Sequence, residues 1–235
     1  MTAVAHVGPS VDDNNRYIAL TPLGDRVRLA YTVIFGEVPG ATQRAAIDAN
    51  HDGTISEAEG HAFGVTLAAK VAQALDLELD GAKYSLHWSA IDVSMGTPQV
   101  AAGTFAVDLV AYACFAKPRG RHHVLVRDRF AIARPGEVEA RVEDAPGITI
   151  ERARVGTLDD DNHDFRFAGA DGPLADDGFD VVLVAGDRSI VAPDADCPAV
   201  PDAPGRTPLL VLALAGAAAL ALASWLFVRA RRKRA

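Results

Sequence analysis

Apolar residues alternate with polar ones along much of the chain, and this period of two is the feature that most restricts its fold. Val27, Leu29, Tyr31 and Val33 form one such series, and a second series covers residues 105–113. Successive side chains of a strand point to opposite faces, so the pattern is typical of strands with one buried face. Helical spacing dominates only one long segment, residues 57–75. We therefore expect a mainly β fold with an α insertion, an antiparallel β-sandwich over residues 6–192.

Turn residues divide this pattern into strands. Asp80-Gly81 is the strongest hairpin signal, and turns at residues 23–26 and 186–187 separate two further pairs of strands. Two helices within residues 41–75 are expected between the second and third strands. The sequence predicts strands at residues 17–21, 27–35, 76–79, 84 onward, 87–93, 105–113, 123–130, 137–142, 148–154, 181–184 and 189–191.

Residues 48–59, which read DANHDGTISEAE, carry oxygen ligands at alternate positions. Gly53 is the sixth residue, where a sharp turn needs a permissive backbone. The segment resembles the calcium loop of the EF-hand family, and the resemblance implies a bound Ca²⁺ ion. Its ligands would be side-chain oxygens, a backbone carbonyl and a water on the serine. The expected metal ligands are Asp48, Asn50, Asp52, Thr54, Ser56 and Glu59.

The flanks of this loop depart from the EF-hand family. The entering helix has to fit between Pro39-Gly40 and the loop, which leaves about two turns. Arg44 and Gly60 stand where the family usually has apolar residues. The chain has no second loop of this pattern, so a paired switch of the calmodulin type is not expected. The alternative is an acidic turn that caps the following helix, because Ser56 and Glu59 also fit a capping box.

A second acidic segment, residues 159–164, is the nearest competitor for a metal site. It lacks a glycine at the turn and a glutamate at the closing position. We therefore expect a solvated acidic loop there.

Residues 209–228 are almost wholly apolar, and twenty helical residues rise about 30 Å, which matches the hydrocarbon core of a bilayer. A proline-rich linker, residues 193–208, precedes this segment, and a basic tail, residues 229–235, follows it. Basic flanks stay in the cytoplasm. The sequence thus predicts one C-terminal transmembrane helix in contact with the lipid bilayer, with the N-terminal domain in the periplasm or at the cell surface. Residues 1–5 are expected to be the remnant of a signal peptide.

Charge also restricts the partners. The formal net charge is −8 and five basic residues follow Val228, so the preceding part carries −13. Such a domain suits divalent cations and argues against nucleic acid. Its two cysteines, Cys114 and Cys197, could form a disulfide in an oxidising compartment, but spacing alone does not decide this.

Two further resemblances concern the ends of the chain. Residues 15–40, NRYIALTPLGDRVRLAYTVIFGEVPG, are similar to extracytoplasmic segments fused to bacterial nickel/cobalt-type transporters. The chain departs from those proteins in having a single predicted span, so no transport activity is carried over. Cys197, the apolar segment and the arginine-rich end together resemble bacterial C-terminal sorting signals of the myxobacterial type, which implies cleavage near the cysteine.

The chain carries none of the common catalytic motifs, and we expect that it is not an enzyme. His122 and His123 are neighbours on an expected strand, so their rings should point to opposite faces and not share a metal. The expected function is a membrane-anchored, extracytoplasmic calcium-binding protein, in which Ca²⁺ acts structurally in a binding or adhesion module with a protein partner at the cell envelope. The alternative is an accessory subunit that captures a metal or a substrate for a membrane transporter.

Overall fold

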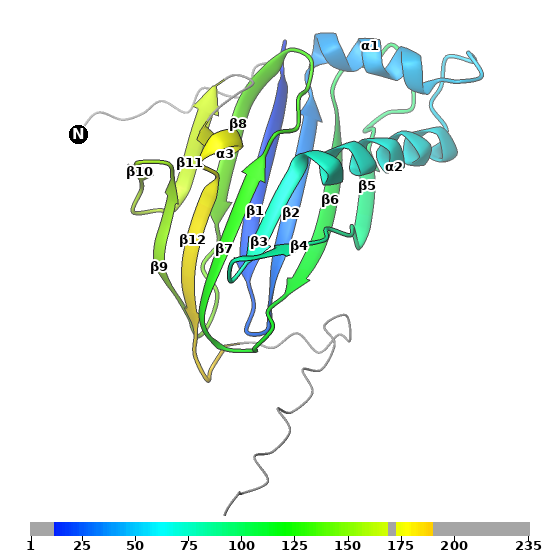
Figure 1. Cartoon of the computed structure of the whole chain (residues 1–235). Helices are drawn as coiled ribbons and strands as arrows, with labels where there is room; N and C mark the ends of the chain where they lie inside the picture. The colour runs from blue at the N-terminus through cyan, green and yellow to red at the C-terminus, as the bar shows by residue number, and fades with distance from the viewer. Residues whose placement is uncertain (1–11, 169–172, 190–235) are drawn as a thin grey trace, which may run out of the picture. The chain divides into compact units, whose positions relative to one another are not determined.

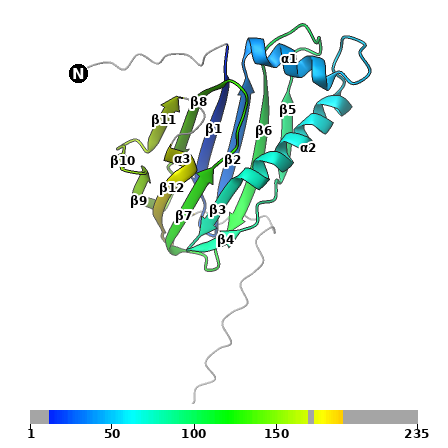
Figure 2. The same cartoon turned by 45° about the horizontal axis from the view of Figure 1, so that its top comes forward.

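The alternating segments pair into two six-stranded sheets in the computed structural model, which describes residues 12–168 and 173–189 (Figures 1 and 2). The first sheet has the order β11-β8-β1-β2-β6-β5, and the second has the order β10-β9-β12-β7-β3-β4. The strands of the first sheet are β1 (Asn14–Pro22), β2 (Arg26–Phe35), β5 (Ala90–Ser94), β6 (Phe105–Cys114), β8 (Pro135–Val142) and β11 (Asp164–Ala168). Those of the second are β3 (Leu75–Leu79), β4 (Ala82–Tyr84), β7 (Gly120–Asp128), β9 (Ile148–Val155), β10 (Leu158–Asp159) and β12 (Phe179–Ala185).

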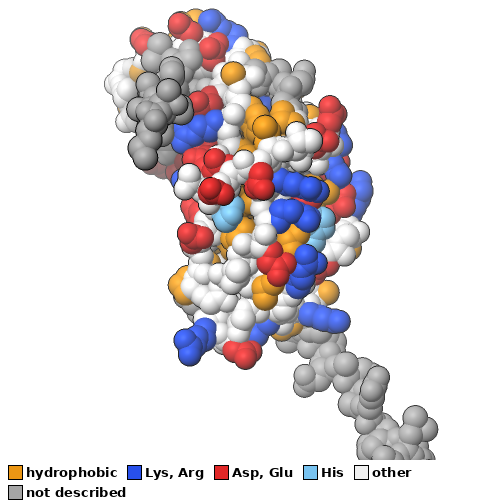
Figure 3. Space-filling model, turned by 90° about the vertical axis from the view of Figure 1, so that its left-hand side faces the viewer, with side chains coloured by type: hydrophobic (Ala, Val, Ile, Leu, Met, Phe, Trp, Pro, Cys, Tyr) orange, Lys and Arg blue, Asp and Glu red, His pale blue; other side chains and the backbone are white. Residues whose placement is uncertain are grey.

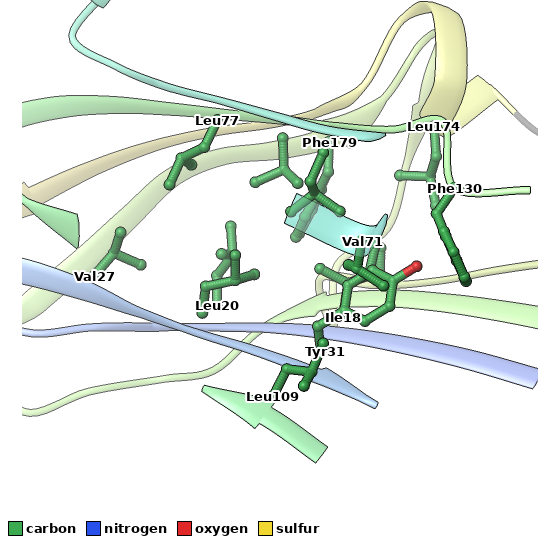
Figure 4. Packing of buried hydrophobic residues seen from close by; sticks show 14 of the residues in the cluster. Ile18, Leu20, Val27, Tyr31, Val71, Leu77, Leu109, Phe130, Leu174 and Phe179 are labelled. Carbon is green, nitrogen blue, oxygen red and sulfur yellow. The ribbon is translucent and has the colours of Figure 1, made fainter. Parts of the chain in front are cut away.

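One hydrophobic core joins the two sheets, and the alternating residues supply it (Figure 4). Ile18 and Leu20 of β1 and Tyr31 of β2 are buried from one side, while Leu77 of β3 and Phe179 of β12 are buried from the other. The predicted β-rich fold is therefore confirmed, and the inward faces are those that the period of two indicated.

The expectation of purely antiparallel sheets is wrong at one place. β1 and β2 form an antiparallel hairpin, but β1 pairs with β8 in parallel, with Ile18 opposite Ala140. A parallel neighbour requires a long connection, and residues 23–134 separate the two strands. Sequence alternation shows that both are strands with a buried face, but it does not reveal which strands are neighbours.

In the described part of the chain, three helices accompany the sheets: α1 (Glu37–Ile47), α2 (Glu57–Ala74) and a short α3 (Pro173–Asp176). As expected, α1 and α2 lie between β2 and β3, so they form the connection from one sheet to the other (Figure 1). α2 packs closely on β5, because a β-carbon at Gly64 would lie 2.6 Å from the side chain of Val93. The indole of Trp88 also donates to the carbonyl of Ala68 at 2.9 Å.

α1 is longer than the sequence indicated, because it begins at Glu37 and includes Pro39 and Gly40. Proline is accepted in a first turn, where its missing N–H has no helical partner. Gly40 is needed because a β-carbon there would overlap the carbonyl oxygen of Gly103. The helix–loop–helix thus spans residues 37–74 instead of 41–75.

Other boundaries also differ from expectation. The strand expected at residues 87–93 is β5, which begins only at Ala90, and β11 was not predicted. Within the acidic segment at residues 159–164, β10 and β11 take the two ends and leave only a tight turn between them. The Asp80-Gly81 hairpin is confirmed, with φ of 51° and 81° at its two turn residues.

Several predicted features lie outside the described residues, among them the signal remnant at 1–5, the linker at 193–208, the span at 209–228 and the tail at 229–235. The strand expected at 189–191 is described only at Ser189, which lies in a turn. Within residues 12–168 and 173–189, no helix is long and apolar enough to cross a membrane.

The side of the molecule shown in Figure 3 carries charges of both signs together with histidines. Asp180 of β12 accepts from Arg152 at 2.9 Å, from Arg154 at 3.3 Å and contacts His123 at 3.2 Å. The ring of His122 is buried on the inner side of the sheet, and its Nδ1 lies 3.0 Å from a carboxylate oxygen of Asp80. The two neighbouring histidines therefore do point to opposite faces, as the sequence predicted.

Candidate metal centre

The loop of residues 48–59 joins α1 to α2, and its first residue is held in place by the loop itself. Asp48 is the C-terminal cap of α1 and is 5% exposed. Its Oδ1 accepts from the backbone N–H of Asp52 at 3.2 Å, and its Oδ2 accepts from that of Gly53 at 3.0 Å. Gly53 has φ of 85°, which glycine adopts without steric cost. The chain therefore wraps back around its first carboxylate, as an ion-binding loop must.

The next three candidate ligands contact one another. Asn50 Oδ1 accepts from the N–H of Asp52 at 2.9 Å, and its Nδ2 donates to Asp52 Oδ2 at 3.0 Å. Asp52 Oδ1 accepts from the N–H of Thr54 at 2.8 Å and from its hydroxyl at 2.6 Å. These bonds favour the charged form and hold the pKa of Asp52 below its usual range, with the Thr54 hydroxyl as the largest cause.

Glu59, the closing residue, connects both ends of the loop. Its Oε2 accepts from the N–H and the hydroxyl of Ser56, at 2.9 and 2.7 Å, and its Oε1 accepts from the N–H of Ala49 at 2.9 Å. Ser56 in turn accepts from the N–H of Glu59, which completes a capping box at the start of α2. The backbone N–H of Ser56 is the main reason that the pKa of Glu59 lies below its usual range.

The residues fit a calcium ion by their chemistry, although the three carboxylates are not gathered around one point. Within the described ranges, no group of three His, Cys, Asp or Glu side chains is poised to hold a metal. Asp48, Asp52 and Glu59 instead bond to amides of the same short loop. Ca²⁺ prefers six to eight hard oxygens, and those of the expected ligands all lie on this loop or its caps. The capping box between Ser56 and Glu59 is present too. The contact between these two residues therefore agrees with both interpretations of the sequence, a calcium loop and an acidic turn that caps α2.

A second segment, which no sequence motif indicated, pairs with the loop. The N–H of Ile55 donates to the carbonyl of Pro98 at 2.7 Å, and the N–H of Val100 donates to that of Gly53 at 3.1 Å. Thr54 and Gln99 form an antiparallel bridge between these two bonds. We call residues 95–104, the connection from β5 to β6, the brace segment. In paired EF-hands a second loop would supply such a contact, and here a segment of the sandwich supplies it.

The side chain of Arg44 binds the brace segment through hydrogen bonds to its backbone. Its side chain is fully buried, and its guanidinium lies 5.5 Å from the centre of the Phe105 ring. It donates to carbonyls of the brace segment, at 2.8 Å for Thr97 and 3.1 Å for Gln99. Further acceptors are the carbonyls of Met95, Gly103 and Thr104. The residue that departs most clearly from the EF-hand pattern thus anchors the segment that pairs with the loop.

No protein-family model matches this chain, and no curated protein matches it.

Proposed function

We propose that this chain is a membrane-anchored, extracytoplasmic protein in which Ca²⁺ has a structural role in a binding or adhesion module. The observation that carries the proposal is the bracing of the loop. Thr54 and Ile55 are paired with the brace segment, so a metal bound by the loop also stabilises the connection from β5 to β6. The anchor is inferred from residues 209–228, which lie outside the described residues.

Calcium acts here by mass action. It would bind the folded loop and not the unfolded chain, and stability would rise by roughly 1.4 kcal/mol at ten times the dissociation constant. Extracellular calcium modules have dissociation constants on the order of 10⁻⁴ to 10⁻³ M, and a single loop belongs in that range. Calcium outside the cytoplasm would then keep the site filled, which suits a structural clamp better than a switch.

The test compares melting temperatures of the full-length protein in detergent, in millimolar calcium and in chelator. We expect calcium to raise the melting temperature by about 3–6 °C. Glu59→Gln should abolish this rise, because it weakens the closing contact. Glu57→Gln is the matched control: it removes the same charge from the same helical turn, at an exposed position that is not a ligand. Magnesium should substitute poorly, because it demands a smaller octahedral site.

Calorimetric titration with calcium completes the test. A melting temperature indifferent to calcium, together with no heat of binding, would show that residues 48–59 are only an acidic turn. An equal loss in Glu57→Gln and Glu59→Gln would show a general charge effect instead of a ligand role.

A further inference from the structure

A groove of about 500 Å³ lies between the first turn of α2 and β5, next to the calcium loop. Ile55, Met95 and Pro98 contribute apolar surface to it, and Glu57 and Asp92 contribute carboxylates. Of the residues that line this groove, none is a lysine or an arginine. The groove is therefore lined by both apolar and polar side chains, and the exposed carboxylates of Glu57 and Asp92 make its rim acidic.

The groove runs along the edge of β5 and not along one face of it. Three consecutive residues, Ile91, Asp92 and Val93, all line it, although successive side chains of a strand point to opposite faces. In the described part of the chain, β5 is the last strand of its sheet and pairs only with β6. An edge strand presents backbone N–H and C=O groups that a further extended strand can bind.

Charge at this edge indicates what kind of strand fits. Asp92 lies directly opposite Asp108 of β6, on the outward face of the sheet. Like charges opposite each other destabilise a ladder, and a cation in the next position would relieve the repulsion. On the inward face, Ile91 and Val93 turn toward α2, so an added strand would place apolar side chains there.

Gly60 keeps the groove open. A β-carbon at this position would sit 3.8 Å from the methyl of Met95 and 4.0 Å from the side chains of Ile55 and Val93. Larger side chains would extend past these atoms into the groove. The helix itself does not require glycine here, because Gly60 is within α2 and has no positive φ. Glycine inside a helix costs about 0.5–1 kcal/mol relative to alanine.

We propose that the edge of β5 and this groove form a docking site for an extended segment of a partner protein, in which basic residues alternate with apolar ones. The segment would add to the first sheet as a seventh strand. Its basic residues would lie beside Asp92, and its apolar residues would enter the groove. The proposal deepens the binding-module role proposed above, on which it rests, but the site itself is built from β5 and α2 and can be tested apart from the metal.

The probe is a fluorescein-labelled, capped seven-residue peptide of alternating lysine and valine, titrated against the full-length protein in a zwitterionic detergent. We expect saturable binding by fluorescence anisotropy and slowed amide exchange at residues 91–93. A peptide of the same sequence with an N-methyl group at every residue has no backbone N–H on either edge, cannot form the ladder and should not bind. A peptide of alternating glutamate and valine should also fail, because it meets the acidic rim.

Protein variants locate the site. Gly60→Val should weaken binding by about tenfold, since its branched side chain would occupy space in the groove that an apolar residue of the peptide needs. Gly60→Ala, which adds one methyl and favours the helix, should weaken it less and ensures a folded variant. Asp92→Asn should weaken binding by about threefold. Asp159→Asn changes the net charge by the same amount at an exposed position of β10, in the other sheet, and should leave binding within about twofold.

The outcomes separate the alternatives. Equal binding of the methylated and unmethylated peptides, or equal effects of Asp92→Asn and Asp159→Asn, would mean non-specific adsorption and would overturn the proposal. Self-association through residues 91–93 that excludes the peptide would assign the edge to a second copy of this chain and overturn it as well. Peptide binding that persists in a protein without calcium binding would leave this site standing and refute only the metal role.

Discussion

Arg44 shows how one residue can replace a whole structural partner. A buried guanidinium carries a charge that cannot be neutralised by deprotonation, so it must be satisfied by acceptors. Five backbone carbonyls of the brace segment provide them. The brace segment has no regular secondary structure over most of its length, and these bonds fix its shape.

Replacing Arg44 with leucine, the kind of residue that EF-hands usually have at this place, should therefore be harmful. The carbonyls would lose their donor inside the protein, at a cost of about 3 kcal/mol or more. The amides of Ile55 and Val100 should exchange faster, and calcium affinity should fall. Arg44→Lys keeps the charge but has three donors on one nitrogen, so it should lie between wild type and leucine. If hydrogen exchange at both amides were unchanged in Arg44→Leu, the brace segment would keep its conformation without the guanidinium.

The acid side of the pH scale tests the loop carboxylates. The pKa values of Asp52 and Glu59 lie below their ordinary values, so both groups contribute stability that is fully present above the ordinary range. That contribution is lost only as the pH falls through the lowered values. We expect the calcium-dependent rise in melting temperature to be the same at pH 7 and pH 5 and to disappear below about pH 4.

His51→Asn is a useful control in this experiment, because His51 lies within the loop but is not one of the expected ligands. Its φ is 59°, a conformation that asparagine tolerates, so His51→Asn removes the imidazole without backbone strain. Loss of the calcium effect between pH 7 and 5 in both proteins would show that the carboxylates are not protected as described.

The sequence predicted the loop at residues 48–59, but it did not predict the contacts of Arg44 and the brace segment that support this loop. The spacing of Asp48, Asp52 and Glu59 is local, and a local motif can be read directly. Arg44 and the brace segment are 51 to 60 positions apart in the chain. Contacts of that kind depend on how the sheets fold, and nothing in the immediate neighbourhood of Arg44 encodes them.

The alternation of apolar and polar residues predicted most strands correctly. It marks a strand with one buried face, and this property depends only on the sequence of that strand. β5 was placed too early: Trp88 is out of phase with Ile91 and Val93, so the alternation of β5 does not reach back to residue 87. β11 was missed because Phe165 and Phe167, its alternating pair, follow an acidic run that dominates the local composition. The start of α1 was placed too late because proline and glycine ordinarily end or interrupt helices.

A buried ion pair connects the two sheets, and it should be the most sensitive polar contact of the fold. Arg16 of β1 donates to Asp128 of β7 at 2.7 Å, and the Tyr31 hydroxyl donates to the same carboxylate oxygen at 3.1 Å. Asp128→Ala would remove the carboxylate that compensates the buried charge of Arg16, which would keep the carbonyl of Phe130 as an acceptor, and should cost about 3–5 kcal/mol in free energy of unfolding.

The control is the double variant Arg16→Met with Asp128→Leu, which replaces the pair by apolar side chains. Removing both charges should cost less than removing one, because no uncompensated charge stays buried. Denaturant titration of the three proteins measures this. If the double variant were less stable than Asp128→Ala, the pair would contribute by its geometry and not by mutual charge compensation.

For the molecule as a whole, the cysteines give the clearest measurable consequence. Cys114, at the end of β6, is disulfide-bonded. The chain has one other cysteine, Cys197, which lies outside the described residues. A bridge between Cys114 and Cys197 would close a loop of about 80 residues. In the chain-entropy model, such a bridge would stabilise the fold by about 4 kcal/mol.

Reductant should therefore lower the melting temperature of wild type and leave Cys114→Ser unchanged. Mass spectrometry of non-reduced peptides should find residues 114 and 197 joined in protein prepared from an oxidising compartment. Two free thiols in that material would contradict the expectation and with it the inferred location outside the cytoplasm.

The pairing of β1 with β8 also has a consequence for the protein while it is being made. Residues 23–134 must be added after β1 before its parallel neighbour exists. At ribosomal speeds of about 5–20 residues per second, this takes roughly 6–20 s. During that time one side of β1 offers an unsatisfied row of amides and carbonyls to any extended chain nearby. A nascent chain of this kind needs either a holding chaperone or a channel that keeps it apart from its neighbours until β8 has emerged.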